Sequence, residues 1–354
     1  MSAPELHELV CVVHVHSIYS DGTGTVPEIA DAAARAGADV VLLTDHDTLS
    51  ARDNGEEGWH GPVLLLVGTE ISPPNRDHFL AFGINRLVSR RLSGPEIAAA
   101  VREAGGFGFA AHPFSHGSER FSRVEPMPFA EVTDDRVDGL ELWSFLNDTA
   151  ERLASLPAVA RFIAAPRRVV DHPPAGNVAA WDAVCARRRM VAIAGTDAHQ
   201  VGLRMRGRVP LRLMSYRRSF SMLRTHALCE EPLSRDLDHD RTQVYSALRE
   251  GRCYMAFDGA APAHGFSFWA EGEAGTLRMG EEAELGEGYE LHARSPRHAT
   301  LRLLRNGDEL ARNAGRAIDF EASEPGAYRV DARLDLKGRE VTWVLTNPVY
   351  LRAR

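Results

Sequence analysis

Lysine is nearly absent from this chain of 354 residues. Lys337 is the single lysine, so all but one of the 41 Lys and Arg residues are arginine. Schiff-base catalysis and P-loop phosphoryl transfer each need a lysine at a defined place, and Lys337 lies in a turn-like segment, DLKGRE. The shortage of lysine therefore argues against both kinds of chemistry.

Cysteine is also sparse, and its spacing excludes the usual cysteine motifs. The four cysteines, at positions 11, 185, 229 and 253, lie far apart and form no Cys-x-x-Cys pair. Such isolated residues are expected to be buried small hydrophobic side chains, which neither require an oxidising compartment nor build a cysteine-type zinc site.

Long apolar segments are missing as well. No stretch approaches the roughly 18 apolar residues of a membrane span, and no basic segment followed by an apolar run begins the chain. We therefore predict no signal peptide, no contact with a membrane and a cytoplasmic location.

The remaining composition is that of a globular protein. Hydrophobic residues make up 44% and charged residues 25%, and the length favours two domains. The formal net charge of −8 argues against strong nonspecific binding of nucleic acid, although a local basic groove stays open.

Short apolar runs alternate with helical patterns over the first 260 residues. Helices are predicted over 25–37, where Thr25 is a cap and Pro27 lies in the first turn, and over 93–105, 181–188 and 243–251. Apolar runs without polar alternation are typical of parallel strands that are buried on both faces. The alternation of such runs with helices predicts an α/β barrel or an open α/β sheet. The apolar runs are 9–16, 38–46, 63–71, 78–84, 106–113, 139–144 and 190–199.

The pattern changes near residue 260. Short strands separated by glycine turns follow, and Asn306–Gly307 indicates a hairpin. We predict a first domain over 1–260 and a small C-terminal β-sandwich over 261–354. Within the first domain, residues after 200 form an arginine-rich loop, and 217–229 are expected to be a strand.

Nearly every apolar run carries a metal-type ligand at or beside one end. In α/β barrels the catalytic groups lie at the carboxyl ends of the strands. Burying so many imidazoles and carboxylates without a partner would cost several kcal/mol each, and shared cations remove that cost. A set of nitrogen and oxygen ligands suits manganese, zinc or iron. The residues are His14, His16, Asp21, Asp45, His46, Asp47, Glu70, His78, His112, Glu141, Asp197 and His199.

The motifs HVHSIYSDG, TDHD, GTE, AHP and GTDAH, taken in order over about residues 8–258, resemble those of the polymerase-and-histidinol-phosphatase (PHP) superfamily. The resemblance implies a distorted (β/α)7 barrel that holds two or three divalent metal ions at its mouth. It implies His14, His16, Glu70 and Asp197 at the first ion, and Asp21, His46 and His199 at the second. At a third ion it implies Glu70, His78 and His112.

Other positions have two interpretations each. His78 is either a ligand or a surface histidine, and Asp45 either orients a histidine ligand or caps a turn. Glu141 either supports a ligand or is simply buried in a strand. The whole layout, including the TNPVYL ending, is similar to a bacterial branch of metal-dependent phosphoesterases and to carbaryl-hydrolase-like proteins.

The expected mechanism needs no nucleophilic side chain. A hydroxide that bridges two metals attacks phosphorus while the metals clamp the phosphoryl oxygens. Arginines near the mouth would bind the phosphate, and His116 is a candidate general acid whose alternative is a surface-loop histidine. The candidate arginines are Arg120, Arg123, Arg204, Arg206 and Arg208.

Several functions stay open at this point. The first is a phosphoesterase acting on a small-molecule or nucleotide phosphate ester. The second is a carboxyl-ester, carbamate or amide hydrolase on the same metals, and the third is a non-catalytic metal-binding regulatory module. A proofreading role beside a DNA polymerase is disfavoured by the acidic charge. The C-terminal domain is expected to bind substrate, cover the mouth or hold an oligomer together.

Overall fold

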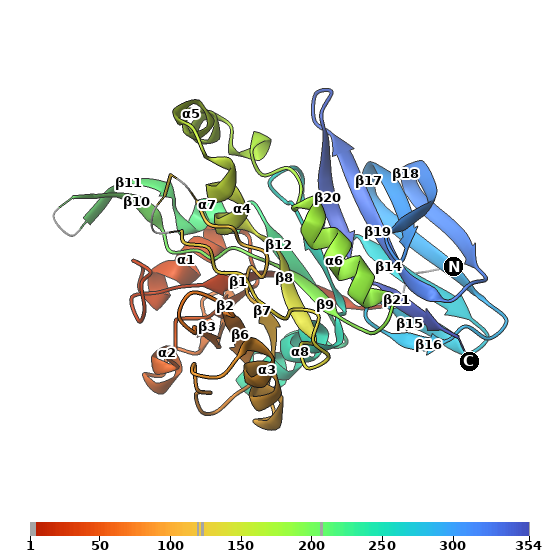
Figure 1. Ribbon diagram of the computed structural model, residues 1–354, viewed down its shortest axis with the longest axis horizontal. Helices are drawn as coiled ribbons and strands as arrows, with labels where there is room; N and C mark the ends of the chain where they lie inside the picture. The colour runs from red at the N-terminus through yellow and green to blue at the C-terminus, as the bar shows by residue number, and fades with distance from the viewer. Residues whose placement is uncertain (1–4, 119, 122–123, 206–207, 354) are drawn as a thin grey trace.

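The structure is a computed structural model, and it describes residues 5–118, 120–121, 124–205 and 208–353, without the side chains of 201–213. The chain forms a mixed α/β molecule with two large sheets and a separate two-stranded ribbon (Figure 1). The α/β segments precede the β-rich part along the chain, as the sequence predicts.

Three parallel strands begin the first sheet. They are β1 (His7–Val15), β2 (Val40–Leu43) and β4 (Val63–Val67), and they pair in the order β1–β2–β4. All residues of β2 and β4 are buried, which is why these runs show no polar alternation. The short strand β3 (Gly58–His60) closes this edge antiparallel to β4, and α2 (Ser50–Asp53) precedes it.

The second sheet is only partly parallel, whereas the apolar runs are typical of parallel strands. β7 (Phe107–Ala110), β8 (Gly139–Ser144) and β9 (Val191–Gly195) are parallel. However, β6 (Phe79–Phe82) runs antiparallel to both β5 (Thr69–Ile71) and β7. The connection from β5 to β6 is too short for the crossover that parallel neighbours need, so the chain turns back directly.

Backbone hydrogen bonds join the two sheets near the ends of β1 and β9. Thr196 N–H donates to Val13 O at 2.8 Å, and His16 N–H donates to Ala198 O at 3.0 Å. On the other side, Gly68 N–H donates to Leu43 O at 2.8 Å, where β4 leads into β5. These bonds bring the carboxyl ends of strands from both sheets together.

The two helices predicted from capping patterns are present. α1 (Val26–Ala36) begins after a capping box between Thr25 and Glu28, and it ends at Gly37 with φ of 74°. α3 (Gly94–Glu103) begins after Ser93 in the same manner. Each cap satisfies backbone groups that the helix itself leaves free, so the local sequence suffices to place these ends.

Other helices were misplaced or missed. α6 (Ala175–Cys185) and α8 (Leu237–Glu250) begin before the predicted 181 and 243. The predicted strand over 217–229 is wrong in its first part, because Ser215 caps α7 (Tyr216–Phe220) and the strand β12 (Arg224–Cys229) follows only then.

Three elements between β8 and α6 had no counterpart in the prediction. They are the helices α4 (Phe145–Arg152) and α5 (Leu156–Ala164) and the short 3-10 turn η1 (Pro166–Arg168). The expected arginine-rich loop is instead a hairpin of β10 (Val201–Met205) and β11 (Arg208–Met214), which extends away from the body in Figure 1.

The C-terminal part is built from strands alone over residues 261–353, as predicted. Asn306 and Gly307, both with positive φ, form the hairpin turn that their sequence indicates. One feature was not foreseen: β13 (Cys253–Ala256) pairs with β20, so the first sheet continues across residue 260. The strands are β14 (Ser267–Gly272), β15 (Gly275–Arg278), β16 (Glu282–Glu284), β17 (Tyr289–Arg305), β18 (Asp308–Ala322), β19 (Gly326–Asp335), β20 (Glu340–Thr346) and β21 (Val349–Arg352).

The four cysteines are free and buried, as expected. No helix in the described ranges is long and apolar enough to cross a membrane.

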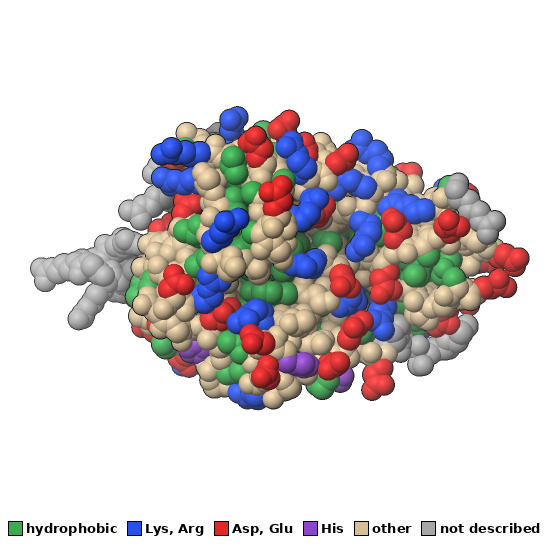
Figure 2. All heavy atoms as spheres, turned by 90° about the horizontal axis from the view of Figure 1, so that it is seen from below, with side chains coloured by type: hydrophobic (Ala, Val, Ile, Leu, Met, Phe, Trp, Pro, Cys, Tyr) green, Lys and Arg blue, Asp and Glu red, His purple; other side chains and the backbone are tan. Residues whose placement is uncertain are grey.

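Exposed arginines are interspersed with acidic side chains on the face shown in Figure 2. Ion pairs at the surface of the protein include Arg102–Asp138 at 2.7 Å and Arg136–Asp134 at 2.8 Å. Exposed pairs of this kind contribute only about 0–1 kcal/mol each to stability. Some of the many arginines therefore form ordinary ion pairs at the surface.

A buried charged cluster lies where the two parts of the first sheet meet. His226 on β12 contacts Glu8 Oε1 through Nδ1 at 2.6 Å and Asp258 Oδ2 through Nε2 at 3.2 Å. Because both ring nitrogens face carboxylates, both must carry a proton, and the imidazole is held in its charged form. The ring stacks on Tyr254 of β13, which couples the cluster to the strand that leads into the C-terminal part.

Replacing His226 is expected to destabilise the protein in a pH-dependent way. Burial alone would lower the pKa of His226, but Asp258 and Glu8 raise it above its usual value. Such a group stabilises the fold fully below its unfolded pKa of about 6.5, and this contribution is lost as the pH rises through the folded pKa. We expect His226→Gln to lower the free energy of unfolding by roughly 3–5 kcal/mol near pH 6 and by less in the alkaline range.

Urea unfolding followed by circular dichroism at several pH values measures this difference. His298→Gln, at an exposed position, is the matched control. A loss of stability that is equal at acidic and alkaline pH would show that the charge of His226 is irrelevant.

Candidate metal centre

The end of β1 places two imidazoles in the interior. His14 and His16 are fully buried. The strand does not alternate regularly here, because the pairing with β2 shifts between Val13 and Val15 and His14 has a φ of 65°. Both rings nevertheless point to the carboxylate of Glu70. The spacing of two residues therefore predicts that the rings lie on the same side, but it does not predict the irregular backbone between them.

Glu70, on β5, is the centre of the cluster. Its Oε2 lies 3.2 Å from Nε2 of His14, Nε2 of His16 and Nδ1 of His46. Its Oε1 lies 2.8 Å from Nδ1 of His78 and 3.3 Å from Nε2 of His112. Five imidazoles therefore converge on one carboxylate that is itself 1% exposed.

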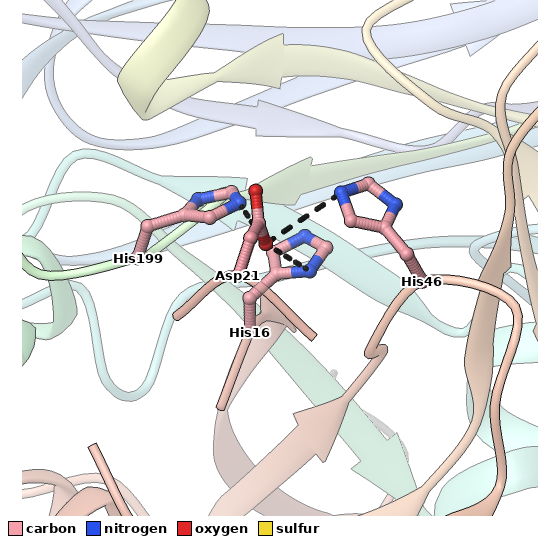
Figure 3. A group of neighbouring side chains, drawn as sticks. All are labelled: His16, Asp21, His46 and His199. Carbon is pink, nitrogen blue, oxygen red and sulfur yellow. Dashed lines mark ion pairs between the residues drawn. The ribbon is translucent and has the colours of Figure 1, made fainter. Parts of the chain in front are cut away.

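A second carboxylate, Asp21, gathers imidazoles at the more exposed end. Its Oδ1 lies 3.0 Å from Nε2 of His199 and 3.7 Å from a ring nitrogen of each of His16 and His46. Figure 3 shows the three rings arranged around this oxygen. The loop after β1 therefore brings Asp21 together with His16 from the start of the same loop, with His46 from the loop after β2 and with His199 from the loop after β9.

Asp197 joins the cluster from the loop after β9. Its Oδ1 lies 3.3 Å from Nε2 of both His14 and His16. Its other oxygen accepts a hydrogen bond from Nδ2 of Asn147 at 2.9 Å. Sequence reasoning missed Asn147, although it follows closely after the strand that carries Glu141, and that proximity was the one available signal.

Protonation holds this cluster together when no cation is bound. Burial would lower the pKa of His14, but Glu141, Asp197 and Glu70 raise it well above its usual value. Burial likewise opposes the charge of His16, whose carboxylate neighbours raise its pKa to about 9. Burial would raise the pKa of Glu70, yet the neighbouring histidines, of which His14 has the largest effect, hold this pKa well below its usual value. A divalent cation would replace several of these protons.

The nitrogen and oxygen atoms of the cluster are better suited to bind a cation than to form hydrogen bonds with one another. Nε2 of His16 is buried and makes no hydrogen bond, although two carboxylate oxygens lie near it. An unpaired buried nitrogen is costly, and coordination would satisfy it. Four groups have ligand atoms within 4.8 Å of one another: His16, Asp21, His46 and His199; His14, His16 and Glu70; His14, His112 and Asp197; and His46, Glu70 and His78.

All nine predicted ligands take part in these groups. The groups overlap: His16 lies both with His14 and Glu70 and with Asp21, His46 and His199, so the assignment of ligands to separate ions stays a prediction. His78, for which a surface position was the alternative, is buried and contacts Glu70.

Glu141, on β8, fixes the orientation of His14. Nδ1 of His14 donates to the two oxygens of Glu141 at 3.1 and 3.2 Å, so Nε2 faces Glu70 and Asp197. Glu141 also accepts the backbone N–H of His112 at 2.8 Å. A Cβ at Gly195 would lie 1.9 Å from Glu141 Oε1, so glycine is required there for the close approach.

Replacing Glu141 is expected to weaken metal binding without removing a ligand. Partners that orient metal-ligating histidines typically contribute about 10–100-fold to metal affinity. We therefore expect Glu141→Gln to raise the Kd for Mn²⁺ or Zn²⁺ by that factor, as measured by calorimetry. Glu131→Gln, at an exposed position, is the control, and an unchanged Kd in Glu141→Gln would contradict this role.

Of the two interpretations of Asp45, its contacts favour a residue that holds a turn over one that directly orients a histidine. It accepts hydrogen bonds from Ser17 N–H at 2.7 Å, Ser17 Oγ at 2.6 Å and Ser20 Oγ at 2.6 Å. Ser20 Oγ in turn lies 3.4 Å from Nδ1 of His16. Asp45 therefore fixes the loop that carries Asp21 through Ser17 and Ser20, which both lie within the HVHSIYSDG motif.

Of the predicted phosphate-binding arginines and the predicted general acid His116, only Arg120 is a described residue that lines the pocket. Arg120 lies at the rim of the pocket described below, in an exposed position. His116 is exposed, and it is not among the described residues that line this pocket. Arg123 and Arg206, and the side chains of Arg204 and Arg208, lie outside the described part of the chain.

The backbone is strained at the cluster. The φ values of His14, His112 and Asp197 are 65°, 30° and 46°. These values lie in the left-handed region, which residues other than glycine rarely adopt. Each such residue costs on the order of 1–3 kcal/mol, and strain of this kind concentrates at functional sites.

A pocket of about 550 Å³ opens onto the cluster. Its polar floor consists of Asp21, His46, Glu70, His78, His112, Asp197 and His199. The volume is in the range of small-molecule sites, and the pocket gives the cluster access to a ligand.

Comparisons with known proteins are distant. No family model matches the chain. An uncharacterized protein of Methanocaldococcus jannaschii is 25% identical over 143 residues, which cover 37% of this chain and 75% of that protein.

Two solved structures are similar at low identity. One is a two-domain protein of Bacteroides vulgatus described as containing a predicted PHP-like metal-dependent phosphoesterase. It is 16% identical with a TM-score of 0.44 over 98% of this chain and 97% of its own. The other is a protein of Bifidobacterium adolescentis with a provisional assignment as a metal-dependent phosphoesterase. It is 18% identical with a TM-score of 0.34 over 58% of this chain and 92% of its own. Similarity this low leaves the function to be argued from the site.

Proposed function

We propose that this protein is a metal-dependent phosphoesterase that cleaves a small-molecule phosphate ester. The observation that carries the proposal is the convergence of five imidazoles on Glu70, within 3.3 Å of its two oxygens. The sequence motifs that resemble the PHP superfamily supply Glu70 and all of these imidazoles except that of His78. A buried cluster of this composition at the floor of a pocket suits hydrolysis assisted by metal ions.

Two or three divalent cations, manganese, zinc or iron, would be held by the nine ligands. Cations bound there supply Lewis acidity toward a phosphoryl oxygen and toward the attacking water. The ligands are His14, His16, Asp21, His46, Glu70, His78, His112, Asp197 and His199.

The other residues of the site position groups rather than react. Glu141 holds His14 with Nε2 turned to the cluster, and Asn147 holds one oxygen of Asp197. Asp45 ties down the loop that carries Asp21. Arg120, at the rim, is suited to bind a phosphate oxygen through its guanidinium.

We interpret residues 1–260 as a distorted (β/α)7 barrel and residues 261–354 as a β-sandwich domain. The hydrogen bonds between the ends of β1 and β9 support closure of the barrel, and the reversed strand β6 is its distortion. In this interpretation the ligands lie at the carboxyl-end mouth, where barrel enzymes bind their substrates.

A carboxyl-ester or amide hydrolase is the second candidate, because apolar side chains wall the pocket next to the metal ligands. Parallel assays with p-nitrophenyl phosphate and p-nitrophenyl acetate, each with Mn²⁺ and with Zn²⁺, separate the two. We expect a higher kcat/KM for the phosphate. A preference for the acetate would favour the second candidate, and metal binding without turnover of either ester would indicate a regulatory module.

A further inference from the structure

The pocket has two chemically different surfaces. Its floor is the charged cluster, and its walls are mostly apolar. The walls come from α4 with the following Leu153, from α5, and from Phe121, Val124 and Met127, together with Met214 at the end of β11. The apolar wall is Phe121, Val124, Met127, Leu146, Leu153, Val159, Phe162, Ile163 and Met214.

The wall is anchored in the core yet open to solvent. Phe162 and Leu153 are 2% and 5% exposed and belong to the main hydrophobic core. Ile163, which also lines the pocket, is 46% exposed, and Leu156 on the same helix is 68% exposed. Figure 1 shows α5 standing out from the body of the molecule. Apolar surface left open beside a polar site is typical of a ligand-binding surface.

We propose that the substrate is amphiphilic: an anionic ester group lies on the charged floor, and an aryl or branched alkyl group lies against the apolar wall. This inference rests on the proposed function and adds the class of substrate. Sugar phosphates fit this pocket less well, because hydroxyl groups placed against the wall would lose their hydrogen bonds to water without replacement.

Binding of two phosphonates, which are not hydrolysed, tests the wall independently of turnover. Calorimetry on the Mn²⁺-loaded protein compares phenylphosphonate with methylphosphonate, which share the anionic group and differ in the apolar one. We expect phenylphosphonate to bind at least about tenfold more tightly, since one methylene in an apolar pocket is already worth about tenfold or more. Equal affinities would overturn the proposal.

Ile163→Ser removes apolar surface from the wall at a position that is open to solvent. We expect it to reduce the ratio of the two affinities by about threefold, because only the phenyl group reaches the wall. Leu87→Ser is the matched control, since Leu87 is 48% exposed and does not line the pocket. A ratio unchanged in Ile163→Ser, or reduced equally in Leu87→Ser, would contradict a role of the wall.

Turnover distinguishes failure of this inference from failure of the proposed function. We expect kcat/KM for phenyl phosphate to exceed that for glycerol 3-phosphate by about tenfold or more. Hydrolysis of both esters without this preference would overturn the inference alone. Hydrolysis of neither, together with tight binding of phenylphosphonate, would overturn the phosphoesterase proposal and support the amphiphilic pocket.

Discussion

Glu70→Gln is expected to abolish high-affinity metal binding and to lower kcat/KM toward a phosphate ester by roughly a thousandfold. Glutamine keeps the shape of the side chain but removes the charge on which five imidazoles converge. Stabilisation of the transition state by metal ions is worth several kcal/mol, and each 1.36 kcal/mol corresponds to about a tenfold change in rate.

Metal content by elemental analysis and the steady-state rate measure the two effects of Glu70→Gln separately. Glu103→Gln, at an exposed position near the end of α3, is the control for the loss of a carboxylate. Circular dichroism at neutral pH checks that the variant folds. A folded variant that retains stoichiometric metal and near-normal turnover would contradict the central role of Glu70.

Removing the metal from the purified protein is expected to abolish hydrolysis and to lower the unfolding temperature. A cation present at a hundred times its Kd stabilises the folded state by about 2.7 kcal/mol, because it binds only that state. Dialysis against a chelator, followed by addition of Mn²⁺, Zn²⁺ or Fe²⁺, should restore both properties. Calcium is the control cation, because a site with this many imidazoles favours transition metals.

The affinity for metal should also depend on pH. The pKa of His16 is about 9 in the metal-free protein, so a cation that takes its Nε2 must displace a proton below that pH. The Kd is therefore expected to fall as the pH is raised from about 6 toward 9. Calorimetric titrations at several pH values measure this trend. An affinity independent of pH, or full activity after chelation, would show that these histidines do not bind a catalytic metal.

Local sequence patterns were sufficient for some elements and insufficient for others. The capping boxes at Thr25 and Ser93 place α1 and α3, because a cap involves residues only three positions apart. The helices α4, α5 and α7 were not predicted, although Ser155 caps α5 and Ser215 caps α7. The antiparallel direction of β6 was not predicted, since a short apolar run has the same pattern in parallel and antiparallel strands.

The sequence by itself determined the chemistry of this protein: which imidazoles and carboxylates exist and near which strand ends they lie. Only the tertiary structure decided how they combine. It joins His14 to Glu141, 127 positions away, and assigns Asp45 to a loop of serines rather than to a histidine. It also brings Asn147 to Asp197 and sets an apolar wall beside the charged floor. The physical reason is that residue type and local spacing are encoded along the chain, whereas these contacts depend on how distant strands and helices pack.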